Sequence, residues 1–233
     1  MQSVIETPRW RKPPSRPPIR PGDLHLWRIP TQDEHRDPLR CLAVLCATER
    51  ARAERILDDT QRVRYLRVQS GLRLILARYL ERPPARIPIT LAPTGKPGLG
   101  LAWPALAFNL TTTEDLALLA ISAGQGVAAE VGLDCERIRP RTHLVAIAAR
   151  MFTQEVCDAI TQATEPQRLQ LFYRAWTALE ADVKCDGRGL FRARPQATAP
   201  PTIAHWVPQT GYIAAVARQW LPDPSQWCLF EGP

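Results

Sequence analysis

Long apolar runs are missing from this 233-residue sequence. No uncharged apolar stretch reaches the ~18 residues that a membrane-spanning helix needs. The first 21 residues place Pro and Arg where a signal peptide needs an apolar core. We therefore expect a cytoplasmic protein without a membrane partner. Hydrophobic residues still make up 45% of the chain, which is enough for a sizeable core.

Closely spaced cysteine pairs are also missing. The sequence contains six cysteines, with no C-x-x-C pair and no histidine at zinc-finger spacing. Structural zinc sites usually need such ligand pairs, so we do not expect one here. The cysteines are expected to be reduced thiols that pack as small hydrophobic residues.

Lysine is scarce, with three residues beside 27 arginines. This bias indicates little pressure for lysine as a general surface charge. Lys96 and Lys184, which lie outside the N-terminal segment, could therefore be retained for their compact ammonium groups. They are candidates for chemistry.

Much of the net charge of +7 lies in residues 1–21, which hold five basic residues, one acid and six prolines. We expect this segment to be a disordered Pro/Arg-rich tail. The alternative is a basic arm for nucleic acid or membrane, but the segment has no amphipathic pattern and one aromatic residue, Trp10. We expect no nucleic-acid partner.

The order of predicted elements favours an α+β fold. Two similar, pseudo-symmetric halves are expected, each a small sheet with packed helices, covering residues 22–123 and 124–233. The site would lie at their interface. The expected helices are 61–80, 143–150, 154–162 and 166–186, and a further one opens at Thr48. The expected strands are 24–29, 41–46, 108–110, 116–122, 127–138, 202–207 and 212–217.

Asp134 and Glu136 lie two residues apart in the predicted strand GLDCE. Because side chains alternate along a strand, both carboxylates leave the same face. A cation between them would relieve their repulsion, and oxygen ligands of this kind suit Mg²⁺. The alternative is an exposed strand face with two solvated acids.

Glu180 and Lys184 are spaced i,i+4 on the predicted helix 166–186, so they share one face. The ordinary explanation is a surface ion pair that contributes a few tenths of a kcal/mol. The scarcity of lysine argues for a more specific role. Upstream, the turn TGKP projects Lys96 from a stiff backbone, and Arg64 on the helix 61–80 could bind a phosphate.

Taken together and in this order, these motifs resemble those of the surfactin-type phosphopantetheinyl transferases. The resemblance runs from about Asp23 to Ala217. Its motifs are the Arg-rich helix, GKP at 95–97, FNL at 108–110, G-x-D-x-E at 132–136 and W-x-x-x-E-A-x-x-K-x-x-G-x-G-L at 176–190.

The resemblance implies an enzyme that moves 4'-phosphopantetheine from coenzyme A to a serine of an acyl or peptidyl carrier protein, as a monomer. By that resemblance Asp134, Glu136 and Glu180 hold Mg²⁺ against the pyrophosphate. Glu180 and Lys184 are catalytic. The residues expected to bind coenzyme A are Arg64, Lys96, Pro97, Thr111 and Thr112. Arg73 matches a recurrent arginine, and a structural ion pair explains it equally well.

Two positions depart from the family pattern. The family usually reads F-N-x-S-H-S, where this chain has FNLTTT, so Thr112 replaces a histidine that donates to a coenzyme A phosphate. Leu179 replaces a lysine next to Glu180. These losses leave open an alternative, a catalytically impaired member that binds a carrier protein or another partner. Retention of the three carboxylates and Lys184 favours the enzyme.

Overall fold

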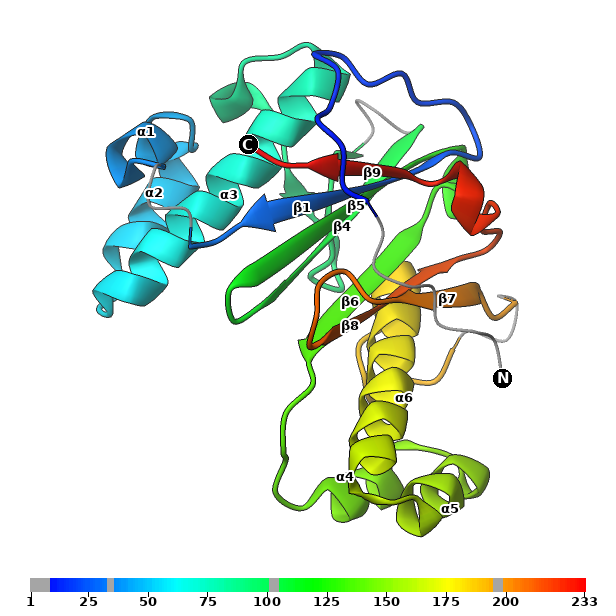
Figure 1. Cartoon of the computed structure of the whole chain (residues 1–233). Coiled ribbons are helices and arrows are strands. Elements are labelled where there is room, and N and C mark those ends of the chain that lie inside the picture. The colour runs from blue at the N-terminus through cyan, green and yellow to red at the C-terminus, as the bar shows by residue number, and fades with distance from the viewer. Residues whose placement is uncertain (1–8, 33–35, 101–104, 195–198) are drawn as a thin grey trace.

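The computed structural model of the chain describes residues 9–32, 36–100, 105–194 and 199–233, and it is an α+β fold, as predicted (Figure 1). A four-stranded sheet has the order β4-β5-β1-β9, and a three-stranded sheet has the order β6-β8-β7. A short hairpin, β2-β3, stands apart from both. The similarity of two halves remains a prediction.

The helices are α1 (Pro38–Ala43), α2 (Ala47–Glu54), α3 (Asp59–Leu80), α4 (Leu144–Met151), α5 (Gln154–Gln162) and α6 (Glu165–Asp186), with short 3₁₀ turns at Pro84–Arg86, Gly126–Ala128 and Pro224–Gln226. The strands are β1 (Leu24–Pro30), β2 (Thr90–Leu91), β3 (Pro97–Gly98), β4 (Leu106–Thr113), β5 (Leu116–Ala123), β6 (Val131–Arg137), β7 (Thr202–Trp206), β8 (Tyr212–Arg218) and β9 (Cys228–Glu231).

Strand β5 is buried along its whole length, because both of its faces pack against apolar layers. Its residues Ala117, Leu119 and Ile121 share a core with α3, while Leu116 and Leu118 share one with β6 and β8. A continuous apolar run such as LALLAIS is typical of a strand buried on both faces. The first sheet is therefore the middle layer, with α3 on one side and the second sheet on the other (Figure 1).

Helix α6 lies directly on the second sheet, where Ala181 and Cys185 pack on Ala215 and Ala217 of β8. Gly132 on β6 makes this close approach possible. A Cβ atom at that position would overlap the carbonyl oxygen of Ala181 and the backbone of Cys185. Small residues on both elements thus bring α6 down onto β6, which carries Asp134 and Glu136.

The part of the N-terminal segment that the structure describes contacts the rest of the protein. The amide of Arg11 donates to the Leu229 carbonyl at 2.9 Å, and the amide of Glu231 donates to the Arg11 carbonyl at 2.9 Å. The indole of Trp10 donates to the Pro208 carbonyl at 3.1 Å. The structure thus pairs Arg11 with β9, while residues 1–8 lie outside the described part. The disorder of residues 1–21 as a whole remains a prediction.

Two sequence-based assignments need correction. Residues 41–46 are not a strand, because Asp37 caps a helix that begins at Pro38, and Cys41 packs toward α3. Strand β9 was not predicted from the sequence, and it pairs in parallel with β1 in the first sheet. Among the described residues, no helix is long and apolar enough to cross a membrane.

We predict that Gly132→Ala lowers the free energy of unfolding by ~2 kcal/mol, because overpacking against backbone forces α6 to shift. Urea denaturation would measure it. Gly98→Ala is the matched control, since a Cβ there meets nothing within 4 Å. Equal losses in the two variants would contradict the close approach of α6 to β6.

Candidate functional site

The site begins at Asp134, whose carboxylate is buried at the junction of β4, β6 and α6. Its Oδ1 accepts hydrogen bonds from Lys184 Nζ at 2.6 Å and from Thr111 Oγ1 at 3.2 Å. Its Oδ2 is buried and has no hydrogen-bond partner among the described residues. A buried carboxylate oxygen without a partner is costly unless a ligand satisfies it.

Glu180 and Lys184 come from one face of α6, as their spacing predicts. The Lys184 ammonium is 4.0 Å from Glu180 Oε2 and closer to Asp134, so it leans toward β6. Glu136 follows Asp134 by two residues on the same face of β6 and is half-buried. Asp134 and Glu136 of β6 therefore lie near Glu180 and Lys184 of α6, with Lys184 in direct contact with Asp134.

The surroundings of Glu136 and Glu180 raise the pKa values of both carboxyl groups. Burial raises the pKa of Glu136, and the negative charge of Asp134 raises it further, although Arg141 and Lys184 oppose the shift. Burial also raises the pKa of Glu180, with Lys184 opposing and Asp134 adding to the rise. Burial is thus the main cause of both shifts, and buried carboxyl groups with raised pKa values are candidates for a functional site.

Within the described part of the chain, no three His, Cys, Asp or Glu side chains are gathered closely enough to hold a metal ion as they stand. The donor set nevertheless fits Mg²⁺, because it consists of carboxylate oxygens and includes the unpartnered Oδ2 of Asp134. Lys184 now supplies positive charge beside Asp134.

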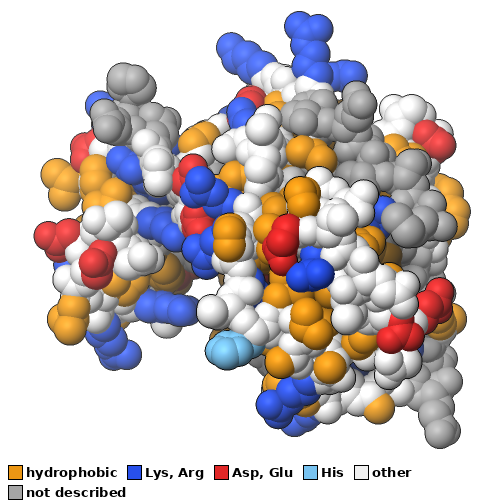
Figure 2. Space-filling view, turned by 60° about the horizontal axis from the view of Figure 1, so that its bottom comes forward, with side chains coloured by type: hydrophobic (Ala, Val, Ile, Leu, Met, Phe, Trp, Pro, Cys, Tyr) orange, Lys and Arg blue, Asp and Glu red, His pale blue; other side chains and the backbone are white. Residues whose placement is uncertain are grey.

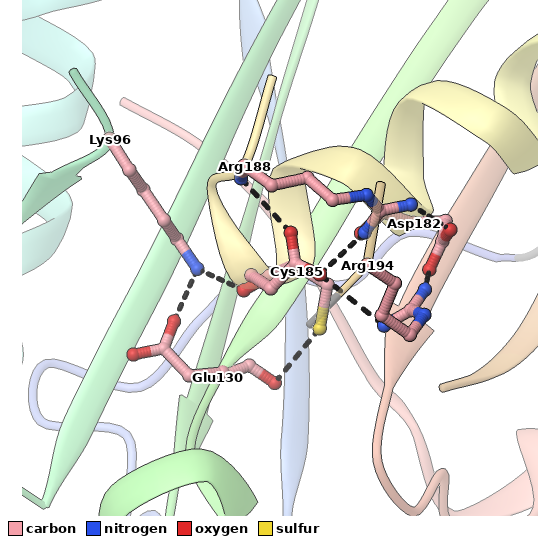
Figure 3. Close-up of polar contacts among 7 residues, drawn as sticks. Lys96, Glu130, Asp182, Cys185, Arg188 and Arg194 are labelled. Atoms are coloured by element: carbon pink, nitrogen blue, oxygen red, sulfur yellow. Dashed lines mark hydrogen bonds and ion pairs between the residues drawn. The ribbon is translucent and has the colours of Figure 1, made fainter. Parts of the chain in front are cut away.

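A cleft of about 320 Å³ opens beside this cluster. Glu180 and Lys184 line one side, and Lys96 and Pro97 line the other. The Lys96 ammonium pairs with Glu130 and donates to the Cys185 carbonyl at 2.6 Å, which ties the GKP turn to the end of α6 (Figure 3). Four of the predicted site residues therefore share one cleft.

Two predicted residues lie elsewhere. Arg64 lines a separate cavity of about 640 Å³ together with Arg67 and Glu114. Thr112 is exposed, and strand alternation turns it to the opposite face of β4 from Thr111. Figure 2 shows Lys and Arg side chains along the hollow between the helical lobe at the left and the rest of the molecule.

Arg73 has a structural role. It is buried, pairs with Glu49 and donates to the carbonyls of Pro84 at 2.7 Å and Ile87 at 3.1 Å. The ion-pair explanation of this arginine is therefore correct.

Two residues near the site were not assigned a role from the sequence. Asn109, in the FNL motif, accepts from the Leu133 amide at 3.0 Å and so holds β6 against β4 next to Asp134. Arg141 lies over the rings of Phe172 and Trp176, at 5.6 and 5.4 Å from their centroids. The position of Asn109 within a motif was a usable signal, whereas one exposed arginine among 27 gives none.

Comparisons with known proteins show which family this chain is similar to. Residues 130–228 match the model of the 4'-phosphopantetheinyl transferase superfamily. This range includes the three carboxylates and Lys184. This match and the relatives described below agree with the family and the class of enzyme predicted from the motifs. The surfactin-type subdivision remains a prediction.

Individual relatives extend the similarity beyond that range. The 4'-phosphopantetheinyl transferase HetI of Nostoc sp. is 29% identical over 223 residues, which cover 89% of this chain and 92% of that protein. The protein slr0495 of Synechocystis sp. is 29% identical over 199 residues, 82% of this chain and 73% of its own length. The 4'-phosphopantetheinyl transferase AcpT of Escherichia coli is 37% identical over 94 residues, 40% of this chain and 45% of its own.

We predict that Glu136→Gln stabilises the metal-free protein at pH 7. Because the pKa of Glu136 is raised in the folded state, the unfolded chain ionises more readily, and folding loses stability as the pH rises through the ordinary value of 4.5. The gain in the variant should therefore shrink as the pH falls below 4.5. Urea denaturation across this range measures it. Glu155→Gln, at an exposed position on α5, is the control. A variant less stable than the wild type at pH 7 would contradict the raised pKa of Glu136.

Proposed function

We propose that this protein transfers 4'-phosphopantetheine from coenzyme A to a serine of an acyl or peptidyl carrier protein, with Mg²⁺. The observation that carries the proposal is the contact of the buried Asp134 carboxylate with Lys184, next to the half-buried Glu180 and beside a cleft, in a chain that matches the model of this superfamily. A phosphoryl-transfer reaction needs positioned charges around a pyrophosphate more than it needs a covalent catalyst.

In this proposal Glu180 accepts the proton of the serine hydroxyl, directly or through one water. Its raised pKa suits a general base, because a stronger base drives the proton transfer further near neutral pH. The serine oxygen then attacks the β-phosphorus of coenzyme A. The bond to the leaving phosphate breaks, and adenosine 3',5'-bisphosphate departs. Lys184 offsets the charge that develops on the pyrophosphate oxygens.

Asp134, Glu136 and Glu180 would hold Mg²⁺. When bound, the ion would neutralise pyrophosphate oxygens and the carboxylates together. Lys184 could then turn from Asp134 toward the phosphates, because a flexible four-carbon chain lets the ammonium change partners. The Thr111 hydroxyl keeps the Asp134 carboxylate oriented meanwhile.

Coenzyme A would lie along the cleft between Lys96 and Pro97 on one side and α6 on the other. Lys96 pairs with Glu130 and donates to the Cys185 carbonyl in this structure, which leaves one of its three N–H donors for a phosphate. Arg64 and Thr112 would bind the 3'-phosphate, with Thr112 supplying a neutral hydrogen bond in place of a charged one. We expect that difference to weaken binding by about 1–2 kcal/mol.

The decisive assay measures the intact mass of carrier proteins after incubation with this protein, coenzyme A and Mg²⁺. One phosphopantetheinyl group should appear on a single serine. Glu180→Ala should lower kcat by about 10²–10⁴-fold, the usual range for loss of a general base. The control Glu155→Ala, at an exposed position on α5, should transfer normally.

Thr112→His should lower the KM for coenzyme A by about tenfold, because an imidazolium restores a charged donor. An unchanged kcat in Glu180→Ala would contradict the assignment of Glu180 as the general base. No transfer to any carrier, even by Thr112→His combined with Leu179→Lys, would favour the non-catalytic binding protein instead.

We further predict that Mg²⁺ strengthens coenzyme A binding by at least tenfold over buffer with a chelator, since the ion bridges carboxylates and pyrophosphate. Asp134→Asn keeps the side-chain volume but removes the charge, and it should abolish this difference. Isothermal titration calorimetry measures both affinities. Equal coenzyme A affinity with Mg²⁺ and with chelator would rule out a metal site at these carboxylates.

A further inference from the structure

Two aspartates stand at the C-terminal end of α6, where acids are unfavourable. Asp182 and Asp186 are spaced i,i+4 and share one face of the last turns. The C-terminal end of a helix carries a partial negative charge, so carboxylates there are destabilising unless cations accompany them. At about 100° per residue, this pair lies roughly 200° around the helix from Glu180 and Lys184.

The required cations come from the segment that follows the helix. Arg188 pairs with both Asp182 and Asp186, and Arg194 pairs with the same two carboxylates (Figure 3). The side chains of Arg188 and Arg194 are only 11% and 19% exposed. Burial disfavours the charged form of Arg188, but the hydrogen bonds to both aspartates outweigh it and raise its pKa.

These ion pairs fix the course of residues 187–194. The chain leaves α6 through Gly187, whose φ of +73° suits glycine, and it passes Gly189 and Leu190, which line the cleft. Gly187 also abuts the opposite wall, because a Cβ atom there would lie 3.2 Å from Lys96 Cβ. One wall of the cleft is thus a turn, and the ion pairs of Arg188 and Arg194 with Asp182 and Asp186 fix its position.

We propose that Arg188 and Arg194 are positioning residues for the transferase, and that they pre-form the wall of the coenzyme A cleft by clamping Asp182 and Asp186. This inference rests on the proposed function. It concerns residues that do not line the cleft themselves and act through the turn that does.

A pre-formed wall favours substrate binding, because the turn need not be ordered when coenzyme A arrives. A less ordered wall should weaken the binding of coenzyme A equally in the ground state and in the transition state. Such a change raises KM and leaves kcat nearly unaltered. A residue that served only to keep the protein folded would instead lower the active fraction, and so kcat, without changing KM.

The test compares transfer kinetics of the wild type and Arg188→Met. We expect the KM for coenzyme A to rise about tenfold, with kcat within about twofold of the wild type. Arg192→Met is the matched control, because Arg192 is exposed on the same turn; its KM should be unchanged. Arg188→Lys retains one positive charge and should recover part of the loss.

Asp186→Asn is a second, milder variant in case Arg188→Met does not fold, since both arginines keep Asp182. Its KM should rise less, by about threefold. An active wild type whose KM is unchanged in Arg188→Met, or in Asp186→Asn, would overturn this inference alone. A wild type that transfers nothing would overturn the proposed function and this inference with it.

Discussion

The close contact between α6 and β6 at Gly132 is the constraint on which the site depends. Without a side chain at Gly132, the backbone of α6 can lie against the strand. That contact brings Lys184 within 2.6 Å of the Asp134 carboxylate, across fifty residues of sequence. A bulkier residue would separate the helix and strand that together supply the carboxylates and the ammonium.

Without a bound ligand, the charges of the site lower the stability of the folded protein, and this loss indicates that a ligand binds there. Burial and mutual repulsion raise the pKa of Glu136, and one oxygen of Asp134 is buried without a partner among the described residues. Stable cores avoid such arrangements. Proteins tolerate them where a ligand completes the charge balance. The same site that lowers folding stability is therefore the one that best fits a cation and a pyrophosphate.

Local signals predicted much of the fold. Pro166 and Gly187 bracket α6 in sequence as they do in structure, and the apolar run 116–122 is a buried strand. The incorrect assignments concern segments whose structure depends on contacts with distant parts of the chain. Residues 41–46 resemble a strand by composition, but Asp37 and the surface of α3 make the region helical. Strand β9 is short, and its pairing with β1 depends on a partner about 200 residues away.

The candidate site was predictable where its spacing is local, as for Asp134 with Glu136 and Glu180 with Lys184. The clamp of Arg188 on Asp182 was not, because arginine is too common here to stand out. A crystal structure with coenzyme A and Mg²⁺ would test directly whether the carboxylates of β6 and α6 form the catalytic site. We expect a cation bound by Asp134 and Glu180, with the pyrophosphate in the adjoining cleft. Coenzyme A bound elsewhere, with Lys184 still on Asp134 and no cation, would contradict it.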